Sequence, residues 1–156
     1  MQHTMLMQKF ISPSAWFELE YPRLWEMEVY EGIPTFFDSF EGKGAIQIFS
    51  VKLGDLNEIP IEMQNYSFLT GKTLVEKMLL FLEKQDIASE ANEIEHFRQN
   101  GALAVAKEYY SENYFYMACM LEKNNIFILS LYNCMDTPDE NEALIISQII
   151  KSIEIY

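Results

Sequence analysis

Apolar and polar residues alternate along two stretches near the start of the chain. The first covers residues 15–21 and the second residues 25–31, with Pro22 between them. Alternation with a period of two is typical of a half-buried strand, and proline suits the turn that would join the two strands. The pattern predicts a hairpin in which Tyr21 lies opposite Trp25. Its buried face would carry Phe17, Leu19, Met27 and Val29, and its solvent face Trp16, Glu18, Glu20, Glu26, Glu28 and Tyr30.

Further elements are predicted before and after this hairpin. Three more strands are expected over residues 8–12, 33–40 and 44–53, with a turn over residues 41–44. Residues 55–67 fit no period and are expected to form a loop. Residues 73–85 have the spacing of an amphipathic helix, and Thr73 with Glu76 forms a capping box at its start.

The last third of the chain predicts four strands and a helix. The strands are expected over residues 92–99, 102–110, 114–123 and 126–133. Asn100-Gly101 is a strong hairpin signal between the first two, and Asn124-Asn125 is a weaker one between the last two. The helix would take Thr137 as N-cap, with Pro138 at its first position and Glu140 completing a capping box. Its apolar stripe would be Leu144, Ile145, Ile149 and Ile153.

The turns of these four strands predict a register. A two-residue turn at Asn100-Gly101 pairs Phe97 with Ala104, and one at Asn124-Asn125 pairs Met120 with Leu129. If Tyr110 and Tyr114 close the turn between the middle strands, Ala104 pairs with Met120. One face then carries three small residues side by side, Ala104, Ala106 and Ala118, where a helix could approach closely. The opposite face, with Val105, Cys119 and Leu121, is also apolar. Because both faces need cover, the predicted fold class is α+β, a three-layer α/β/α sandwich with a central antiparallel sheet.

Composition and charge restrict the functions that suit such a fold. The 156 residues fit one domain, expected over residues 8–156 after a loose lead-in over residues 1–7. The formal net charge of −13 repels phosphate groups, so neither nucleic acid nor an anionic membrane is expected as a partner. The start of the chain lacks a signal-peptide pattern, and no apolar run is long enough to cross a bilayer. A cytoplasmic protein is therefore expected.

The two cysteines predict free thiols. A two-residue turn at Asn124-Asn125 places Cys119 opposite Ser130 and Cys134 opposite Phe115. The cysteines are then four positions out of register, about 13 Å apart at ~3.3 Å per residue. A disulfide needs Cα atoms within about 7 Å of each other.

No catalytic constellation, metal site or cofactor motif emerges. Gly71-Lys72-Thr73 opens a helix as a phosphate-binding loop does, but that loop needs glycine where this chain has Tyr66. His96 would lie opposite Val105, and Val105 opposite Cys119, so two strand spacings, roughly 9.6 Å, separate His96 from Cys119. A nucleophile and its base must lie about 3 Å apart, and we therefore expect no enzyme activity.

The four glutamates of the first hairpin are the most unusual group. Opposed like charges destabilise a strand pair, although the side chains could simply be solvated. A calcium ion usually takes its carboxylates from a loop that wraps around it, so a basic partner is preferred over a metal. Exposed Tyr and Trp beside acidic residues are common on protein-binding surfaces, and also protect strand edges. The candidate interaction surface is Trp16, Glu18, Glu20, Glu26, Glu28, Tyr30, Tyr109 and Tyr110.

The opening Trp16-Phe17-Glu18-Leu19-Glu20-Tyr21-Pro22, followed by Trp25, is similar to the start of PsbP-like domains. In element order the resemblance covers nearly the whole chain, and at the residue level about ten positions. The chain looks most like an uncharacterised bacterial family of that superfamily. The superfamily includes extrinsic subunits of photosystem II, a nuclear transport factor that binds the Ran GTPase, and bacterial chaperones for apolar segments of secreted effectors. The resemblance implies a binding module and supplies no catalytic residues.

Together these observations predict a non-catalytic binding module for another protein, such as an adaptor, chaperone or inhibitor, with a basic protein as the expected partner. The alternative is a small-ligand carrier with a pocket between the sheet and a helix.

Overall fold

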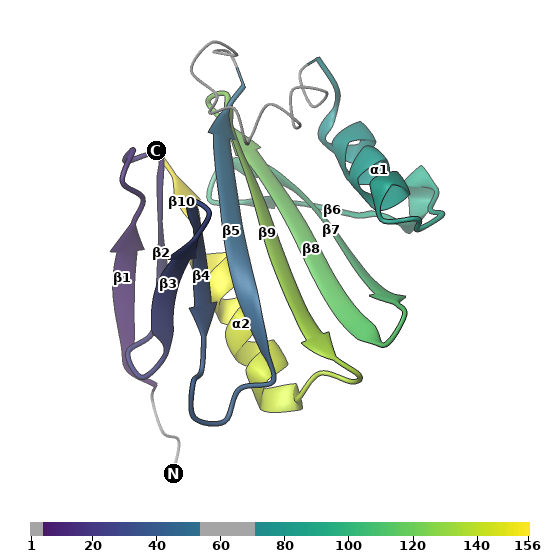
Figure 1. The fold of residues 1–156 in the computed structure, drawn as a ribbon. Coiled ribbons are helices and arrows are strands. Elements are labelled where there is room, and N and C mark those ends of the chain that lie inside the picture. Colours follow the sequence, from purple (N-terminus) through teal and green to yellow (C-terminus); the bar gives the residue numbers. More distant parts are fainter. Residues whose placement is uncertain (1–4, 54–70) are drawn as a thin grey trace.

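A seven-stranded antiparallel sheet organises the molecule (Figure 1). The computed structural model describes residues 5–53 and 71–156, so the loop expected over residues 55–67 lies outside the described residues. In spatial order the strands are β3 (Glu26–Tyr30), β4 (Ile33–Phe37), β5 (Gly44–Lys52), β9 (Ile126–Met135), β8 (Tyr114–Lys123), β7 (Ala102–Ser111) and β6 (Glu95–Gln99). The strands β5, β9, β8 and β7 are long and central because apolar side chains line both of their faces.

Helix α1 (Leu74–Lys84) covers one face of this sheet. The predicted capping box is present: the Thr73 hydroxyl accepts a hydrogen bond from the Glu76 backbone, and the Glu76 carboxylate accepts one from the Thr73 backbone. The helix buries Leu74, Met78 and Leu82 against the sheet. The sheet residues of this first core include Val105, Ala118, Met120, Phe127 and Leu129.

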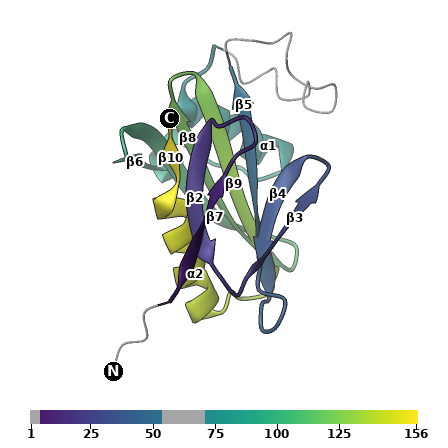
Figure 2. The same ribbon diagram turned by 90° about the vertical axis from the view of Figure 1, so that its left-hand side faces the viewer.

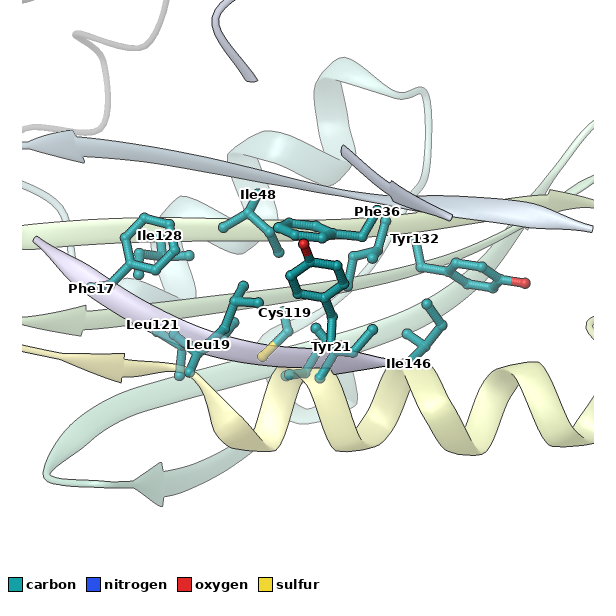
Figure 3. Close-up of a cluster of buried hydrophobic side chains, with 14 of the residues drawn as sticks. Phe17, Leu19, Tyr21, Phe36, Ile48, Cys119, Leu121, Ile128, Tyr132 and Ile146 are labelled. Atoms are coloured by element: carbon teal, nitrogen blue, oxygen red, sulfur yellow. The ribbon is translucent and has the colours of Figure 1, made fainter. Parts of the chain in front are cut away.

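The other face is covered by helix α2 (Glu140–Ser152) and by a smaller three-stranded sheet (Figure 2). The smaller sheet consists of β1 (Met7–Ile11), β2 (Phe17–Pro22) and β10 (Glu154–Ile155), with β2 in the middle. In the second core, apolar side chains of β2 and α2 meet those of the large sheet (Figure 3). The predicted α+β sandwich with helices on both faces is therefore confirmed, and the smaller sheet is an addition to it.

The predicted hairpin over residues 15–31 was wrong. Strand β2 pairs with β1 and β10, while β3 pairs with β4 in the large sheet. The chain moves from one sheet to the other between Pro22 and Glu26. Val29 on the edge strand β3 is 58% exposed rather than buried, whereas the predicted apolar face of β2 is buried against the large sheet. That face carries Phe17, Leu19 and Tyr21.

The predicted register was confirmed at two turns and wrong by one residue at the third. Phe97 pairs with Ala104, and Met120 with Leu129. Between them, Ala104 pairs with Leu121 instead of Met120, because the turn between β7 and β8 contains two residues rather than three. Glu112 adopts a left-handed conformation, φ 56°, and so allows the tighter turn.

A shift of one residue exchanges the faces of a strand. Ala118 therefore lies on the α1 side of the sheet. Cys119 lies on the α2 side, in the position that was expected for Ala118. Both cysteines are free, as predicted, and both are buried. Each has the expected cross-strand neighbour, Ser130 for Cys119 and Phe115 for Cys134.

The start of the C-terminal helix was also predicted wrongly. Its N-cap is Asp139, whose carboxylate accepts a hydrogen bond from the Glu142 backbone, and not Thr137. Ile149 and Ile153 are buried as expected, whereas Leu144 is 64% exposed. Ile146 and Ile150 complete the buried stripe. The predicted stripe failed because α2 buries only one side, and Leu144 lies on the other.

Candidate functional site

The candidate interaction surface is divided between two sheets. Glu18 and Glu20 lie on β2, and Glu26 and Glu28 lie on β3. Because β2 and β3 do not pair, these carboxylates do not oppose one another as the sequence suggested. The four glutamates therefore do not form the single acidic hairpin face that was expected.

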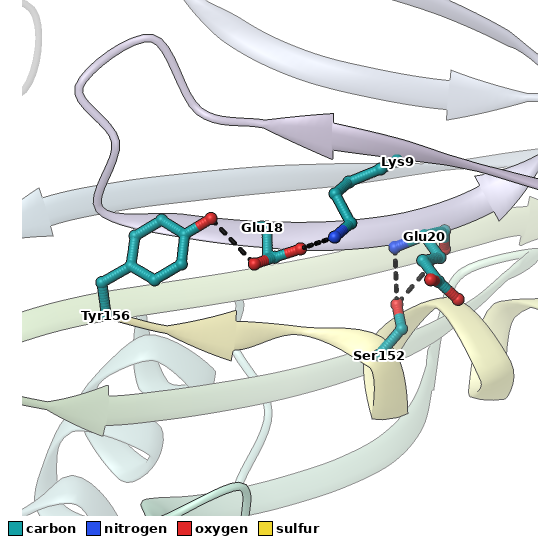
Figure 4. Close-up of polar contacts among 5 residues, drawn as sticks. All are labelled: Lys9, Glu18, Glu20, Ser152 and Tyr156. Atoms are coloured by element: carbon teal, nitrogen blue, oxygen red, sulfur yellow. Dashed lines mark hydrogen bonds and ion pairs between the residues drawn. The ribbon is translucent and has the colours of Figure 1, made fainter.

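Glu18 connects the two ends of the described chain (Figure 4). One carboxylate oxygen lies 2.7 Å from Lys9 Nζ on β1, and the other accepts a hydrogen bond of 2.9 Å from the Tyr156 hydroxyl. The hydrogen bond from Lys9, together with that from Tyr156, lowers the pKa of Glu18 below its ordinary value. These contacts give Glu18 a structural role in the smaller sheet.

Glu20 uses its backbone to join β2 to α2. Its amide donates a hydrogen bond of 2.8 Å to Ser152 Oγ at the end of α2, and Ser152 Oγ lies 3.2 Å from the Glu20 carbonyl oxygen (Figure 4). The Ser152 hydroxyl also lies 2.6 Å from the Ile149 carbonyl oxygen.

Three of the candidate residues lie on β3, an edge strand of the large sheet. Glu26, Glu28 and Tyr30 are exposed, and the Tyr30 hydroxyl donates a hydrogen bond to Glu28. That bond raises the pKa of Tyr30. Acidic side chains on an edge strand discourage pairing with other strands, so this part of the candidate surface has a protective explanation.

The remaining aromatic candidates differ in exposure. Tyr110 is 58% exposed, as expected for a surface residue. Tyr109 is 6% exposed and stacks on Tyr116 with ring centroids 5.0 Å apart, so its expected exposure was wrong. The alternation of β7 turns Tyr109 toward α1 and Tyr110 away from it. Trp16 is partly buried and packs against the second core.

A groove with a volume of about 800 Å³ lies at one end of the molecule. Its apolar lining consists of Met5, Leu6, Pro22, Leu24, Trp25, Phe40 and Ile145, and its charged lining of Arg23, Asp38 and Glu41. Leu24 is 80% exposed and Phe40 is 84% exposed, whereas Trp25 is buried. We call this feature the end groove. Exposed apolar side chains that gather around one groove, rather than being scattered singly, often mark an interaction site.

Local hydrogen bonds hold the backbone of both turns that carry the exposed side chains. The Trp25 amide donates to the Pro22 carbonyl oxygen at 3.0 Å, which forms the turn that carries Leu24. In the turn between β4 and β5, the Asp38 carboxylate accepts a hydrogen bond of 3.0 Å from the Phe40 amide. A side chain at Gly42 would overlap the Asp38 carbonyl oxygen, so this turn requires glycine.

The second turn is also attached to α2. The carboxylate of Glu142 accepts hydrogen bonds from the backbone amides of Lys43 and Gly44, at 3.0 and 3.1 Å. It accepts another from the hydroxyl of Tyr132, and Glu142 is buried. The Phe40 side of the end groove is therefore firmly supported.

The end groove was missed in the sequence because its residues come from separate segments, and its two most exposed side chains, Leu24 and Phe40, lie in turns. A signal was present for Leu24, a large apolar residue in a predicted turn, where polar residues are usual. Phe40 was assigned to the strand expected over residues 33–40, which ends at Phe37. Alternation patterns locate strands, and they give no information on turn residues from different parts of the chain that meet in space.

His96 and Cys119 are not placed to act together. Val105 pairs with Met120, so the predicted alignment of Val105 with Cys119 was wrong. Cys119 faces α2, whereas Val105, the partner of His96, faces α1. Burial raises the pKa of Cys119 to about 12, so its thiol is protonated at neutral pH. Among the described residues, no group of three or more His, Cys, Asp or Glu side chains could hold a metal ion.

Comparison with known proteins identifies the fold. The structure is similar to that of cyanobacterial PsbP (CyanoP) from Synechocystis, with a TM-score of 0.58 at 14% identity over 99% of this chain and 95% of that chain. It also resembles the Saccharomyces cerevisiae Ran-binding protein Mog1p, with a TM-score of 0.51 at 8% identity over 97% of this chain and 96% of that one. The chain therefore has the PsbP/Mog1 fold, as its opening residues suggested.

A third similar structure comes from Bacteroides thetaiotaomicron, with a TM-score of 0.56 and 18% identity. The match covers 96% of this chain and 48% of that protein, so this chain spans about half of its length. No protein-family model matches the sequence, and no curated protein matches it. Within residues 5–53 and 71–156, neither helix is long and apolar enough to cross a membrane.

Proposed function

We propose that this domain is a non-catalytic binding module that recognises another protein through the end groove. The observation that carries the proposal is the exposure of Leu24 and Phe40 on two turns that are themselves held by hydrogen bonds. Binding hot spots are usually large side chains in preformed apolar surfaces surrounded by a polar rim. The end groove has both features, since Arg23, Asp38 and Glu41 border its apolar lining.

The proposed occupant is a basic protein segment with apolar anchor residues. The chain has a formal net charge of −13, so a basic partner is attracted over a long range and associates faster. At the groove itself, Asp38 and Glu41 outnumber Arg23. The apolar anchors of the partner would cover Leu24 and Phe40 and remove them from water.

The fold supports a binding role at the level of analogy. One protein of the same fold, Mog1p, is named for its binding to Ran. Sequence identity to Mog1p is 8%, so the analogy concerns the kind of function and not the partner. A cytoplasmic location is part of the proposal, because both buried cysteines are unbridged.

The experiment compares partner capture by three forms of the protein. The wild type, the double variant Leu24→Asp/Phe40→Asp and the control Leu103→Asp are immobilised and exposed to an extract of the native host. Leu103 is also an exposed leucine, but it does not line the end groove. A protein captured by the wild type and the control, but not by the double variant, would support the proposal.

A synthetic peptide pair then tests the chemistry of the partner. One peptide carries a Leu-Phe core flanked by lysines, and the other carries the same core flanked by glutamates. The lysine peptide is expected to bind more tightly, and salt is expected to weaken its binding. Equal capture by all three forms of the protein would rule out the end groove as the binding site.

Carriage of a small ligand is a second candidate function. A cavity of about 650 Å³ lies between α2 and the strands β6, β7 and β8, which is the place expected for the pocket of a carrier. Cavities of this size accommodate small organic molecules. Native mass spectrometry of protein from its natural host tests this function, since a carrier is expected to retain its ligand during gentle purification.

A further inference from the structure

The cavity beside α2 originates in a row of small side chains across the large sheet. Ala106 on β7 lies opposite Cys119 on β8, and Cys119 lies opposite Ser130 on β9. Of these, Ala106 and Cys119 line the cavity from the sheet, and the helix presents another small side chain, Ser147, to the same space. The space is therefore left open, and we call it the side cavity.

The floor and walls of the side cavity are mainly apolar. Phe97, Ala106 and Met117 contribute from the sheet, and Ile150 contributes from the helix. One end is fixed by Gln99, whose amide nitrogen donates hydrogen bonds of 2.7 and 3.2 Å to the carbonyl oxygens of Ile150 and Ile153. These bonds attach β6 to the end of α2, so the cavity is a stable part of the fold.

Negative charge predominates among the side chains that line the cavity. Glu95 continues the row of small residues, opposite Ala106, and Glu108 lies opposite Met117. Within the described part of the chain, neither carboxylate has a hydrogen bond or an ion pair, whereas Glu93 lies 3.8 Å from Lys107 Nζ. Lys151 on α2 contributes one ammonium group to the lining. The unpaired carboxylates therefore outnumber the unpaired cation.

We infer that the side cavity binds a small amphipathic amine. The apolar body of the ligand would cover Phe97, Met117 and Ile150, and its ammonium group would lie beside Glu95 and Glu108. A cation is favoured over an anion because the whole chain is acidic as well as the cavity. This inference is independent of protein binding, because the side cavity and the end groove share no lining residue.

The test uses two probes that differ in charge. Tryptamine carries an indole ring and an ammonium group, and indole-3-propionate carries the same ring on the same linker with a carboxylate. Each is titrated into the protein by calorimetry and by amide-resolved NMR. Tryptamine is expected to bind roughly tenfold more tightly than indole-3-propionate, and to shift the amide signals of Ala106, Met117 and Ser147.

Three variants locate the site. Glu95→Gln/Glu108→Gln keeps the shape of both side chains and is expected to weaken tryptamine binding roughly tenfold. Ala106→Met fills the cavity and is expected to abolish binding of both probes. Glu83→Gln, on the exposed side of α1, is the control and is expected to bind as the wild type does. Thermal melts establish that each variant is folded.

Three results would overturn the inference. They are equal binding of the two probes, tryptamine shifts at residues away from the side cavity, and no tryptamine binding at millimolar concentration. The carrier function can fail separately from the binding site. If protein purified from its natural host holds no ligand but tryptamine still binds in the side cavity, the binding site is supported and the carrier function is not.

Discussion

The ammonium group of Lys77 lies 2.7 Å from a carboxylate oxygen of Glu122, and the Lys77 side chain is only 1% exposed. The same nitrogen lies 5.5 Å from the centre of the Phe127 ring. Lys77 belongs to α1 and Glu122 to β8, so this ion pair joins the helix to the sheet. A buried ammonium group is tolerated here because it has both an anion and an aromatic face beside it.

The Lys77–Glu122 pair is expected to show strong coupling in a double-mutant cycle. Glu122→Gln leaves the buried ammonium group without its anion and should lower the free energy of unfolding by about 1–3 kcal/mol. Lys77→Met replaces the lysine by an apolar side chain of similar length and should change stability by less than about 1 kcal/mol. The double variant should resemble Lys77→Met. Urea unfolding measures all three, and additive effects would mean that the two side chains do not interact.

Ile149 and Leu144 on α2 are expected to differ sharply in their contribution to stability. Ile149 is fully buried, and Ile149→Ala should lower the free energy of unfolding by about 2–5 kcal/mol. Leu144 is 64% exposed, and Leu144→Ala should change it by no more than about 0.5 kcal/mol. Thermal or urea unfolding compares the two. Similar losses from both substitutions would contradict the orientation of α2.

Glu18 is expected to contribute to acid sensitivity. The hydrogen bonds from Lys9 and Tyr156 lower its pKa in the folded protein from an ordinary value of 4.5. A lowered pKa stabilises the folded state above the unfolded pKa, and the contribution is lost as the pH falls through the folded pKa. The unfolding temperature should therefore fall less steeply below pH 4.5 in Glu18→Gln than in the wild type, with Tyr156→Phe between them. Identical pH profiles for all three proteins would show that these bonds are absent in solution.

Cys119 is expected to react slowly with thiol reagents. Burial raises its pKa from 9.0 to about 12, so the reactive thiolate is scarce in the folded state. A raised pKa stabilises the folded state fully below pH 9, and this contribution is lost as the pH rises toward 12. Thiol counting should find two groups in denaturant and almost none at early times in native buffer. The Cys119→Ala variant should have one reactive thiol in denaturant. If the wild-type protein has no reactive thiol in denaturant, its two cysteines form a disulfide.

Much of the fold could be predicted because its long elements have clear periods and turn residues. Thr73 and Glu76 defined the start of α1, and Asn100-Gly101 and Asn124-Asn125 set two registers correctly. The third register failed because the turn has no glycine, and Glu112 takes the left-handed conformation that glycine would usually supply. The resulting shift of one residue in register places Ala118 in the core beside α1 and Cys119 in the core beside α2, the reverse of the prediction.

The candidate site was harder to predict because it depends on contacts between distant parts of the chain. Alternation correctly assigned Leu19 to the core and Glu20 to solvent, but it did not reveal which strand would pair with β2. The pairing that formed brings Lys9 and Tyr156 to Glu18 and moves Glu28 to another sheet. Local pattern describes the two faces of a strand, whereas partner choice depends on the packing of the whole domain.

The position of β2 between β1 and β10 also has a consequence for biosynthesis. Ile155 pairs with Phe17, and the Tyr156 hydroxyl binds Glu18, which is 138 residues earlier in the chain. During synthesis β1 and β2 leave the ribosome before these partners, and they wait while the residues between Glu18 and Tyr156 are translated. The apolar face of β2 also waits for α2. The smaller sheet is therefore completed only after translation of Tyr156, and until α2 has emerged the apolar face of β2 lacks this cover.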